Sequence, residues 1–373
     1  MMAAIESDLA RAAFMLERAK APTILLGAGA RGASSLVCDL ARCLGAAVLT
    51  TPDAKSLFDE TNPLAAGVFS FGATDMAKAV AKETDVMLAI GTNLGEFATQ
   101  GGSAFAGADV VHMTEDPFDL AIAPRATTTI VGDVAEHMRQ LTLQIRTTPA
   151  TTPWFEGLRA RHASPTAADL HPRRGAIDPR QAVRALGRAL TPDARVACDV
   201  TSAALHVLRD LRFAEGQRLW LQVERSACMG SALAAGLGVR LGSGVPTLVV
   251  IGDWGLMMGG SELHTAASME IGGFVVVVWS NAGGALIRAG VQAQGLDVPA
   301  ETHTWSSPHF ASVARGFGMR AMTVRSARRL ARAAAVALRA PYPVLIDAVI
   351  EPNAEIPGAG ERYLHLDASS GRP

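Results

Sequence analysis

Apolar residues along the chain alternate between two patterns. Short apolar runs, typical of fully buried strands, are followed by stretches in which apolar positions recur every three or four residues, as on one face of a helix. We predict strands over 23–26, 47–50, 86–90, 110–113, 129–131, 195–198, 246–251, 274–279 and 344–349. Strands that alternate with helices predict parallel sheets with helices on both faces. The expected fold class is therefore α/β, with two open, doubly wound, mainly parallel sheets.

The same patterning divides the chain into four segments. Residues 1–146 predict a Rossmann-like domain that begins with a helix over 3–19. Residues 147–178 are rich in Thr, Pro and Arg without an apolar period, which predicts a surface linker. Residues 179–350 predict a second α/β domain, and residues 351–373 a surface tail.

Composition narrows the class of protein. The 373 residues are 49% hydrophobic and 18% charged, which excludes a disordered chain. A formal net charge of -1 gives no bulk attraction to nucleic acid or to an anionic membrane. No apolar run is long enough to cross a bilayer, and the N-terminus lacks a signal pattern. The four cysteines form no Cys-x-x-Cys pair, so we expect neither zinc nor disulfides, and a cytoplasmic location.

A glycine-rich turn follows the first predicted strand. Gly27-x-Gly29-x-x-Gly32 opens a helix, and Asp53 lies 21 positions after Gly32. This arrangement suits a dinucleotide such as FAD, with its pyrophosphate at the helix N-terminus. The same small residues also arise where a strand and a helix pack tightly. The sequence leaves both interpretations open, and direct support for a nucleotide is absent.

A second group of polar residues follows two apolar strands of the second domain. Gly252-Asp253-Trp254-Gly255 ends one strand, and Ser280-Asn281-Ala282-Gly283-Gly284 ends the next. In an open parallel sheet, neighbouring strand ends face the crevice in which ligands bind. A carboxylate and an amide oxygen are hard ligands that suit Mg²⁺ together with phosphate oxygens.

This group resembles the signature of the thiamine-diphosphate enzymes, above all acetolactate synthase, benzoylformate decarboxylase and pyruvate oxidase. Asn281 follows Asp253 after 27 intervening residues, as the family spacing requires to within one residue. Further matches are Cys228-Met229-Gly230, Ala234-Ala235-Gly236-Leu237-Gly238, Asp199-Val200 and the stretch from Pro308 to Gly318. The first domain resembles the family's central domain, so the resemblance covers about residues 20 to 348.

The resemblance implies a role for each matching position. Asp253 and Asn281 would bind Mg²⁺ through their side chains, and Gly283 through its carbonyl. Gly252 and Gly255 would let the backbone approach the diphosphate. Met229 would support the bent cofactor. The expected cofactor-binding set is completed by Thr201, Ser202, Cys228, Trp254 and Gly284. The implied chemistry is decarboxylation of a 2-oxo acid, transfer of the resulting acyl group, or both.

Several positions depart from the family pattern. Trp254 replaces the third residue of the usual Gly-Asp-Gly, and residues 201–203 and 224–227 replace glycine-containing loops. Relatives also begin with a pyrimidine-binding domain that supplies a catalytic glutamate, and no glutamate in this chain matches it. We therefore expect the large subunit of a two-component enzyme, with the glutamate on a pyrimidine-domain partner in a heterodimer or an α2β2 assembly. The alternatives are a non-catalytic scaffold or regulatory subunit, and a nucleotide- or flavin-binding protein that works through Gly27–Gly32.

Overall fold

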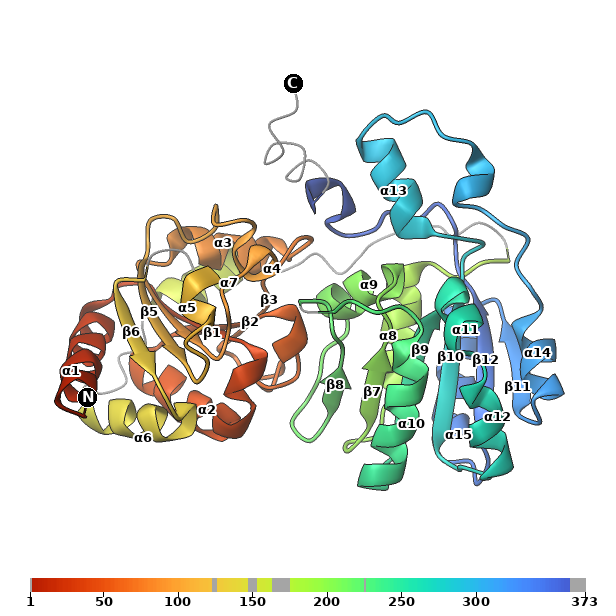
Figure 1. The fold of residues 1–373 in the computed structure, drawn as a ribbon, viewed down its shortest axis with the longest axis horizontal. Helices are drawn as coiled ribbons and strands as arrows, with labels where there is room; N and C mark the ends of the chain where they lie inside the picture. Colours follow the sequence, from red (N-terminus) through yellow and green to blue (C-terminus); the bar gives the residue numbers. More distant parts are fainter. Residues whose placement is uncertain (1, 123–125, 147–152, 163–174, 225, 363–373) are drawn as a thin grey trace. The chain divides into compact units, whose positions relative to one another are not determined.

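The computed structural model describes residues 2–122, 126–146, 153–162, 175–224 and 226–362. The chain divides into two compact units, unit 1 over Met1–Thr166 and unit 2 over Ala167–Pro373. Each unit contains one six-stranded parallel sheet (Figure 1). The predicted fold class is confirmed by these two parallel sheets with flanking helices.

Unit 1 is built on a sheet with the strand order β3-β2-β1-β4-β5-β6. Its strands are β1 (Pro22–Leu26), β2 (Ala47–Thr50), β3 (Ala65–Val68), β4 (Val86–Ile90), β5 (Asp109–Thr114) and β6 (Thr128–Val131). The strand order reverses between β1 and β4, which pair in parallel, and this is the point at which a doubly wound sheet opens a crevice. The five strands predicted in this half all form, each within one residue of its predicted ends, and β3 was not predicted.

Helices cover both faces of this sheet. They are α1 (Met2–Arg18), α2 (Ser34–Leu44), α3 (Asp75–Glu83), α4 (Glu96–Thr99), α5 (Asp119–Ile122), α6 (Val134–Gln144) and α7 (Pro153–Arg161). Side chains of α1, α2 and α6 share one apolar core, and side chains of α3 and α7 share the other. Helix α7 lies inside the range predicted as a surface linker, yet Phe155 and Leu158 are buried against unit 1. Residues 147–152 and 163–174 of that range lie outside the described residues.

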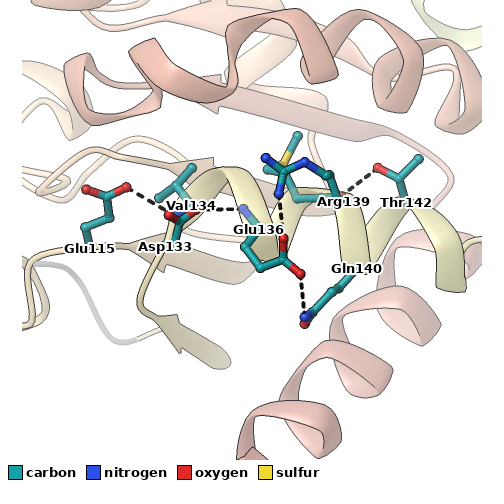
Figure 2. A network of polar contacts seen from close by, with 8 residues as sticks. Glu115, Asp133, Val134, Glu136, Arg139, Gln140 and Thr142 are labelled. Atoms are coloured by element: carbon teal, nitrogen blue, oxygen red, sulfur yellow. Dashed lines mark hydrogen bonds and ion pairs between the residues drawn. The ribbon is translucent and has the colours of Figure 1, made fainter.

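The start of α6 is tied to the loop that follows β5 (Figure 2). The Asp133 carboxylate caps the helix by accepting the backbone N–H of Glu136 at 2.7 Å. The backbone N–H of Val134 donates to the Glu115 carboxylate at 3.3 Å, and Arg139 pairs with Glu136 one turn along the helix. These bonds satisfy backbone donors that a helix N-terminus otherwise leaves free.

Unit 2 has the strand order β11-β12-β10-β9-β7-β8. Its strands are β7 (Arg195–Cys198), β8 (Arg218–Trp220), β9 (Thr247–Gly252), β10 (Phe274–Ser280), β11 (Arg320–Val324) and β12 (Val344–Val349). Every residue of β9 and β10 is buried, as expected for central strands covered on both faces. The edge strands β8 and β11 are partly exposed and were not predicted.

The helices of unit 2 include several that begin at candidate site residues. They are α8 (Pro179–Ala189), α9 (Ser202–Asp210), α10 (Ser231–Ser243), α11 (Asp253–Gly259), α12 (Glu262–Ser268), α13 (Ala285–Ala293), α14 (Phe310–Gly316) and α15 (Ala327–Ala337). Helices α10, α12 and α14 contribute to the core on one face of the sheet, while α15 packs on α8.

The first part of the predicted tail folds against α13. The guanidinium of Arg288 on α13 donates to the Pro352 carbonyl, and the backbone N–H of Glu351 donates to the Ile177 carbonyl at 3.0 Å. Residues 363–373 of the predicted tail lie outside the described residues. Among the described helices of both units, none is long and apolar enough to cross a membrane.

Candidate cofactor and metal site

Three polar residues lie at one edge of the unit 2 sheet, each just after a strand. Asp199 follows β7, Asp253 follows β9 and Asn281 follows β10. Strand β9 pairs in parallel with both β7 and β10, so the carboxyl ends of these strands are neighbours. The sheet topology therefore gathers residues that are far apart in the sequence, as the strand-end pattern predicts.

Asp253 is buried at the first position of α11 and accepts several hydrogen bonds. Its Oδ2 accepts the backbone N–H of Gly283 at 3.0 Å and the indole Nε1–H of Trp305 at 3.1 Å. Its Oδ1 accepts the backbone N–H of Trp254 at 2.8 Å. Burial raises the pKa of the Asp253 carboxyl, and these donors partly counter that rise.

Asn281 contacts the start of α9. Its side-chain Nδ2 donates to the hydroxyl oxygen of Ser202 at 3.3 Å, and both side chains are buried. This contact holds the Asn281 side chain at the start of α9. Ser202 therefore belongs to the site as a hydrogen-bond partner of Asn281.

The donor set of this cluster fits Mg²⁺. Asp253, Asn281 and Gly283 offer a carboxylate, an amide oxygen and a backbone carbonyl, all hard oxygen ligands. The 3.0 Å contact between Gly283 and Asp253 shows that the loop after β10 wraps around the carboxylate. Among the described residues, no group of three or more His, Cys, Asp and Glu side chains is placed so that it could hold a metal ion. The proposed ligand set contains only one such side chain, Asp253, beside an amide and a carbonyl oxygen.

A short strap, residues 303–305, lies over the loop after β10. Gly283 and Thr304 form an antiparallel β-bridge, and the backbone N–H of Trp305 donates to the Ala282 carbonyl at 3.2 Å. The indoles of Trp254 and Trp305 meet edge to face with ring centroids 6.3 Å apart. A Cβ at Gly284 would lie 2.8 Å from the Trp254 ring, so the indole packs against the loop after β10.

Neighbouring protein atoms leave no room for a side chain at Gly252 or Gly255, on either side of Asp253. A Cβ at Gly252 would lie 2.7 Å from the hydroxyl of Thr201, and a Cβ at Gly255 would lie 2.3 Å from Oδ2 of Asp199. The family resemblance explained both glycines by the approach of a diphosphate. The structure adds a second reason, because any side chain at either position would push away the loop after β7.

Asp199 joins the loop after β7 to the start of α10. Its carboxylate is buried and accepts the backbone N–H groups of Gly230 at 2.9 Å and Ala232 at 3.3 Å. Burial raises the pKa of Asp199, and these backbone donors partly counter that rise. The preceding residues, Cys228 and Met229, are exposed beside this anchor.

Two glycines of the unit 1 turn, Gly27 and Gly29, pack against the loop after β4. A Cβ at Gly27 would lie 2.2 Å from the carbonyl oxygen of Gly91, and one at Gly29 would lie 3.0 Å from it. The backbone N–H groups of both glycines already donate to the loop after β4, to Ile90 and to Gly91. Gly27 and Gly29 therefore serve tight packing at the β1–β4 switch point, whereas a Cβ at Gly32 would meet nothing within 4 Å, so nucleotide binding at this turn stays a prediction.

Two neighbours of the site were not found from the sequence. Trp305 lies 52 residues after Asp253 in a stretch without a recognisable motif. Arg288, on α13, has its pKa lowered by burial, and the negative charge of Asp253 opposes that change. The stretch between Asn281 and the Pro308 motif was too irregular for either contact to be expected.

Comparison with known proteins assigns both units. Residues 9–141 match the model of the thiamine pyrophosphate enzyme central domain, and residues 199–348 match that of the C-terminal TPP-binding domain. The chain is 28% identical over 353 residues to an acetolactate synthase large subunit of Parasynechococcus marenigrum, covering 92% of this chain and 56% of that protein. It is 26% identical to a probable acetolactate synthase large subunit of Methanocaldococcus jannaschii, and that alignment covers 94% of this chain and 61% of the relative. It is 27% identical to a probable 2-ketoarginine decarboxylase of Pseudomonas aeruginosa, and that alignment covers 83% of this chain and 54% of the relative. The chain thus spans less than two thirds of the length of these relatives.

Proposed function

Because this chain carries the central and the C-terminal TPP-binding domains of the thiamine pyrophosphate enzymes, we propose that unit 2 binds the diphosphate end of thiamine diphosphate through Mg²⁺. The observation that carries this proposal is the convergence of Asp253, Asn281 and Gly283 at neighbouring strand ends. Asp253 and Asn281 would bind Mg²⁺ by their side chains and Gly283 by its carbonyl, while Ser202 holds the Asn281 amide in place.

We propose that the chain takes part in decarboxylation of a 2-oxo acid, with or without transfer of the acyl group to an acceptor. The relatives named acetolactate synthase and 2-ketoarginine decarboxylase support this class of reaction. Bound thiamine diphosphate supplies the electron sink that such a decarboxylation needs. The four free thiols are compatible with the reducing, cytoplasmic setting that we propose.

We further propose that a partner chain supplies the pyrimidine-binding surface and the catalytic glutamate. Three methionines beside the site support an interface there: Met229 is 39% exposed, Met257 55% and Met258 62%. Gly230 packs directly on α11, with a Cβ at this position 3.1 Å from Met258, so these side chains occupy one region of unit 2. Exposed methionines adapt well to a protein surface that covers them.

The cofactor proposal is tested by calorimetry of thiamine diphosphate with and without Mg²⁺. We expect the wild type to bind only when Mg²⁺ is present. Asp253→Asn should weaken binding by at least about a hundredfold, because loss of a direct ligand should cost more than loss of a supporting group. The matched control is Asp193→Asn, an exposed residue before β7 at the opposite end of the sheet. Unchanged binding by Asp253→Asn would show that the site is wrongly assigned.

One observation favours the scaffold alternative. The Oδ2 atom of Asp253 is already satisfied by Gly283 and Trp305, so this carboxylate is stable without a cation. A scaffold that has lost its cofactor would keep such internal bonds. The same calorimetry separates the two functions, since a scaffold binds no thiamine diphosphate at millimolar Mg²⁺, whether or not Trp305 is replaced.

A further inference from the structure

One stretch of unit 2 carries an unusual concentration of positive charge. Residues 302–346 contain no Asp, Glu or Lys and seven arginines, namely Arg315, Arg320, Arg325, Arg328, Arg329, Arg332 and Arg339. The whole chain has a formal charge of -1, so the remaining residues carry -8. All seven arginines are exposed, and they lie on α14, on β11, on α15 and in the loops beside them. One edge of an almost neutral protein is therefore strongly basic.

The protein itself does not neutralise this charge with ion pairs. None of the ion pairs found among the described residues includes any of the seven. Arg315, Arg325 and Arg339 donate instead to backbone carbonyls, which carry no net charge. Arg325 also acts electrostatically on buried Asp347. The guanidinium of Arg320 lies over the Tyr342 ring, 3.7 Å from its centroid.

Three of these arginines border a groove between the edge strand β11 and α15. The groove, which we call the arginine groove, has a volume of about 690 Å³ and is bordered by Arg320, Arg329 and Arg332. Its apolar lining includes Met322, which is 44% exposed, and Val336, which is 63% exposed. Strand β11 is the last strand of the sheet, so this groove runs along an edge without a neighbouring strand (Figure 1). The surface combines an apolar floor with a cationic rim.

We propose that the arginine groove binds an acidic segment of a partner protein that places an apolar side chain on Met322 and Val336. The rim is complementary to carboxylates, which arginine recognises through paired hydrogen bonds. Arg325, directly after β11, and Arg328, on α15, are next in sequence to groove-lining residues and add further positive charge outside the lining. A nucleic acid fits less well for two reasons. Its phosphates make no favourable contact with an apolar floor, and the aromatic ring in the groove on which a base could stack, Tyr342, is covered by Arg320.

This surface shares no residue with the cofactor site, so the proposal stands whether or not thiamine diphosphate binds. It also shares no residue with the methionine surface around Met229, Met257 and Met258. The two surfaces can therefore be tested separately on the full chain.

The test is fluorescence anisotropy with a labelled ten-residue peptide of glutamates around two central leucines. We expect saturable binding to the full chain that is lost in 0.5 M NaCl, where charges are screened within a few ångströms. Replacing two rim arginines, Arg329→Gln with Arg332→Gln, should weaken binding at least about tenfold, since charge pairs at an interface carry coupling of this size. The control pair is Arg11→Gln with Arg18→Gln, which removes the same charge from exposed positions of α1 and should leave binding unchanged.

A second comparison tests the apolar floor. Val336→Ser should weaken binding of the leucine-containing peptide and leave an all-glutamate peptide unaffected. All the replaced side chains are exposed, so the variants should keep the wild-type melting temperature. The proposal is overturned if the wild type does not bind the leucine-containing peptide at about 100 µM, or if the rim and control pairs bind it equally well. Tighter binding of a ten-nucleotide single strand than of either peptide would also overturn it, in favour of a nucleic-acid surface.

Discussion

Trp305 competes with any cation for one oxygen of Asp253. Its Nε1–H donates to Oδ2 at 3.1 Å and the Gly283 N–H donates to the same atom at 3.0 Å, so a metal ion at Oδ2 would share this oxygen with two donors. We predict that Trp305→Phe, which keeps an aromatic ring and removes the donor, raises the Mg²⁺-dependent affinity for thiamine diphosphate about three- to tenfold, the range expected from one net hydrogen bond. Calorimetry measures the change, and the matched control is Trp154→Phe in unit 1, where the indole Nε1 has no hydrogen-bond partner among the described residues. A weaker affinity in Trp305→Phe would show instead that the indole holds Asp253 ready for the metal.

Asp347 gives a second prediction at this scale. It is buried on β12, its Oδ1 has no hydrogen-bond partner among the described residues, and burial raises its pKa against the opposing effects of Thr323, Arg325 and His309. A carboxyl whose pKa is higher in the folded state than in the unfolded state disfavours folding once it is ionised. That penalty is present at pH values above the folded pKa and disappears as the pH falls toward the unfolded value, near about 3.9.

We therefore predict that Asp347→Asn is stabilising at pH 7.5 and that its advantage shrinks as the pH approaches about 4. The melting temperature should rise at pH 7.5, by roughly 2–4 °C for each kcal/mol gained. Differential scanning calorimetry at several pH values measures this. If Asp347→Asn lowers the melting temperature equally at every pH, the carboxylate is stabilised by its neighbours and the assigned sign is wrong.

At the scale of elements, two helical glycines of unit 2 differ in what surrounds them. A Cβ at Gly255 on α11 would lie 2.3 Å from Oδ2 of Asp199, whereas a Cβ at Gly238 on α10 would meet nothing within 4 Å. Gly255→Ala should destabilise the protein by about 1–3 kcal/mol, the usual cost of overpacking. Gly238→Ala should stabilise it by about 0.5–1 kcal/mol, because alanine favours the helix. Urea denaturation compares the two, and equal effects would show that the loop after β7 can move aside without cost.

Uniform burial explains the clearest of the strands predicted from the sequence, although β6, which alternates buried and half-buried residues, was also predicted. The central strands β1, β4, β9 and β10 are buried along their whole length, so their apolar runs are unbroken. The strands β3, β8 and β11 are short and partly exposed, and their sequences show no such run. Helices α9, α11 and α13 start at the candidate site residues, whose glycines and polar side chains favour loops when read locally.

The candidate site also contains residues that the sequence pattern could group and residues that it could not. Asp253, Asn281 and Gly283 could be grouped from the sequence because strand ends of a parallel sheet meet at one edge. The strap with Trp305 could not be found, since its contacts depend on how the chain returns after α13. The role of Gly255 was also hidden, because its neighbour Asp199 lies on a different strand end.

At the scale of the whole molecule, the proposed partner decides whether the chain is active. Each unit has its own apolar core, so the chain should fold without the partner. Alone, it should bind the cofactor weakly and decarboxylate no 2-oxo acid at a measurable rate. Co-expression with a pyrimidine-domain chain should give a complex that buries more than about 2,000 Å² and shows turnover. Robust turnover by the chain alone, purified free of host enzymes, would contradict the two-component proposal.

The central claim is that Asp253, Asn281 and Gly283 hold the metal of a thiamine diphosphate site. The most direct measurement is anomalous diffraction from crystals of the full chain grown with thiamine diphosphate and Mn²⁺ in place of Mg²⁺. We predict one anomalous peak within about 2.0–2.3 Å of a carboxylate oxygen of Asp253, the amide oxygen of Asn281 and the carbonyl oxygen of Gly283. We also predict that the Trp305 indole has left the oxygen that binds the metal. Ordered crystals soaked to saturation with no peak at these residues, and with Trp305 still bonded to Asp253, would contradict it.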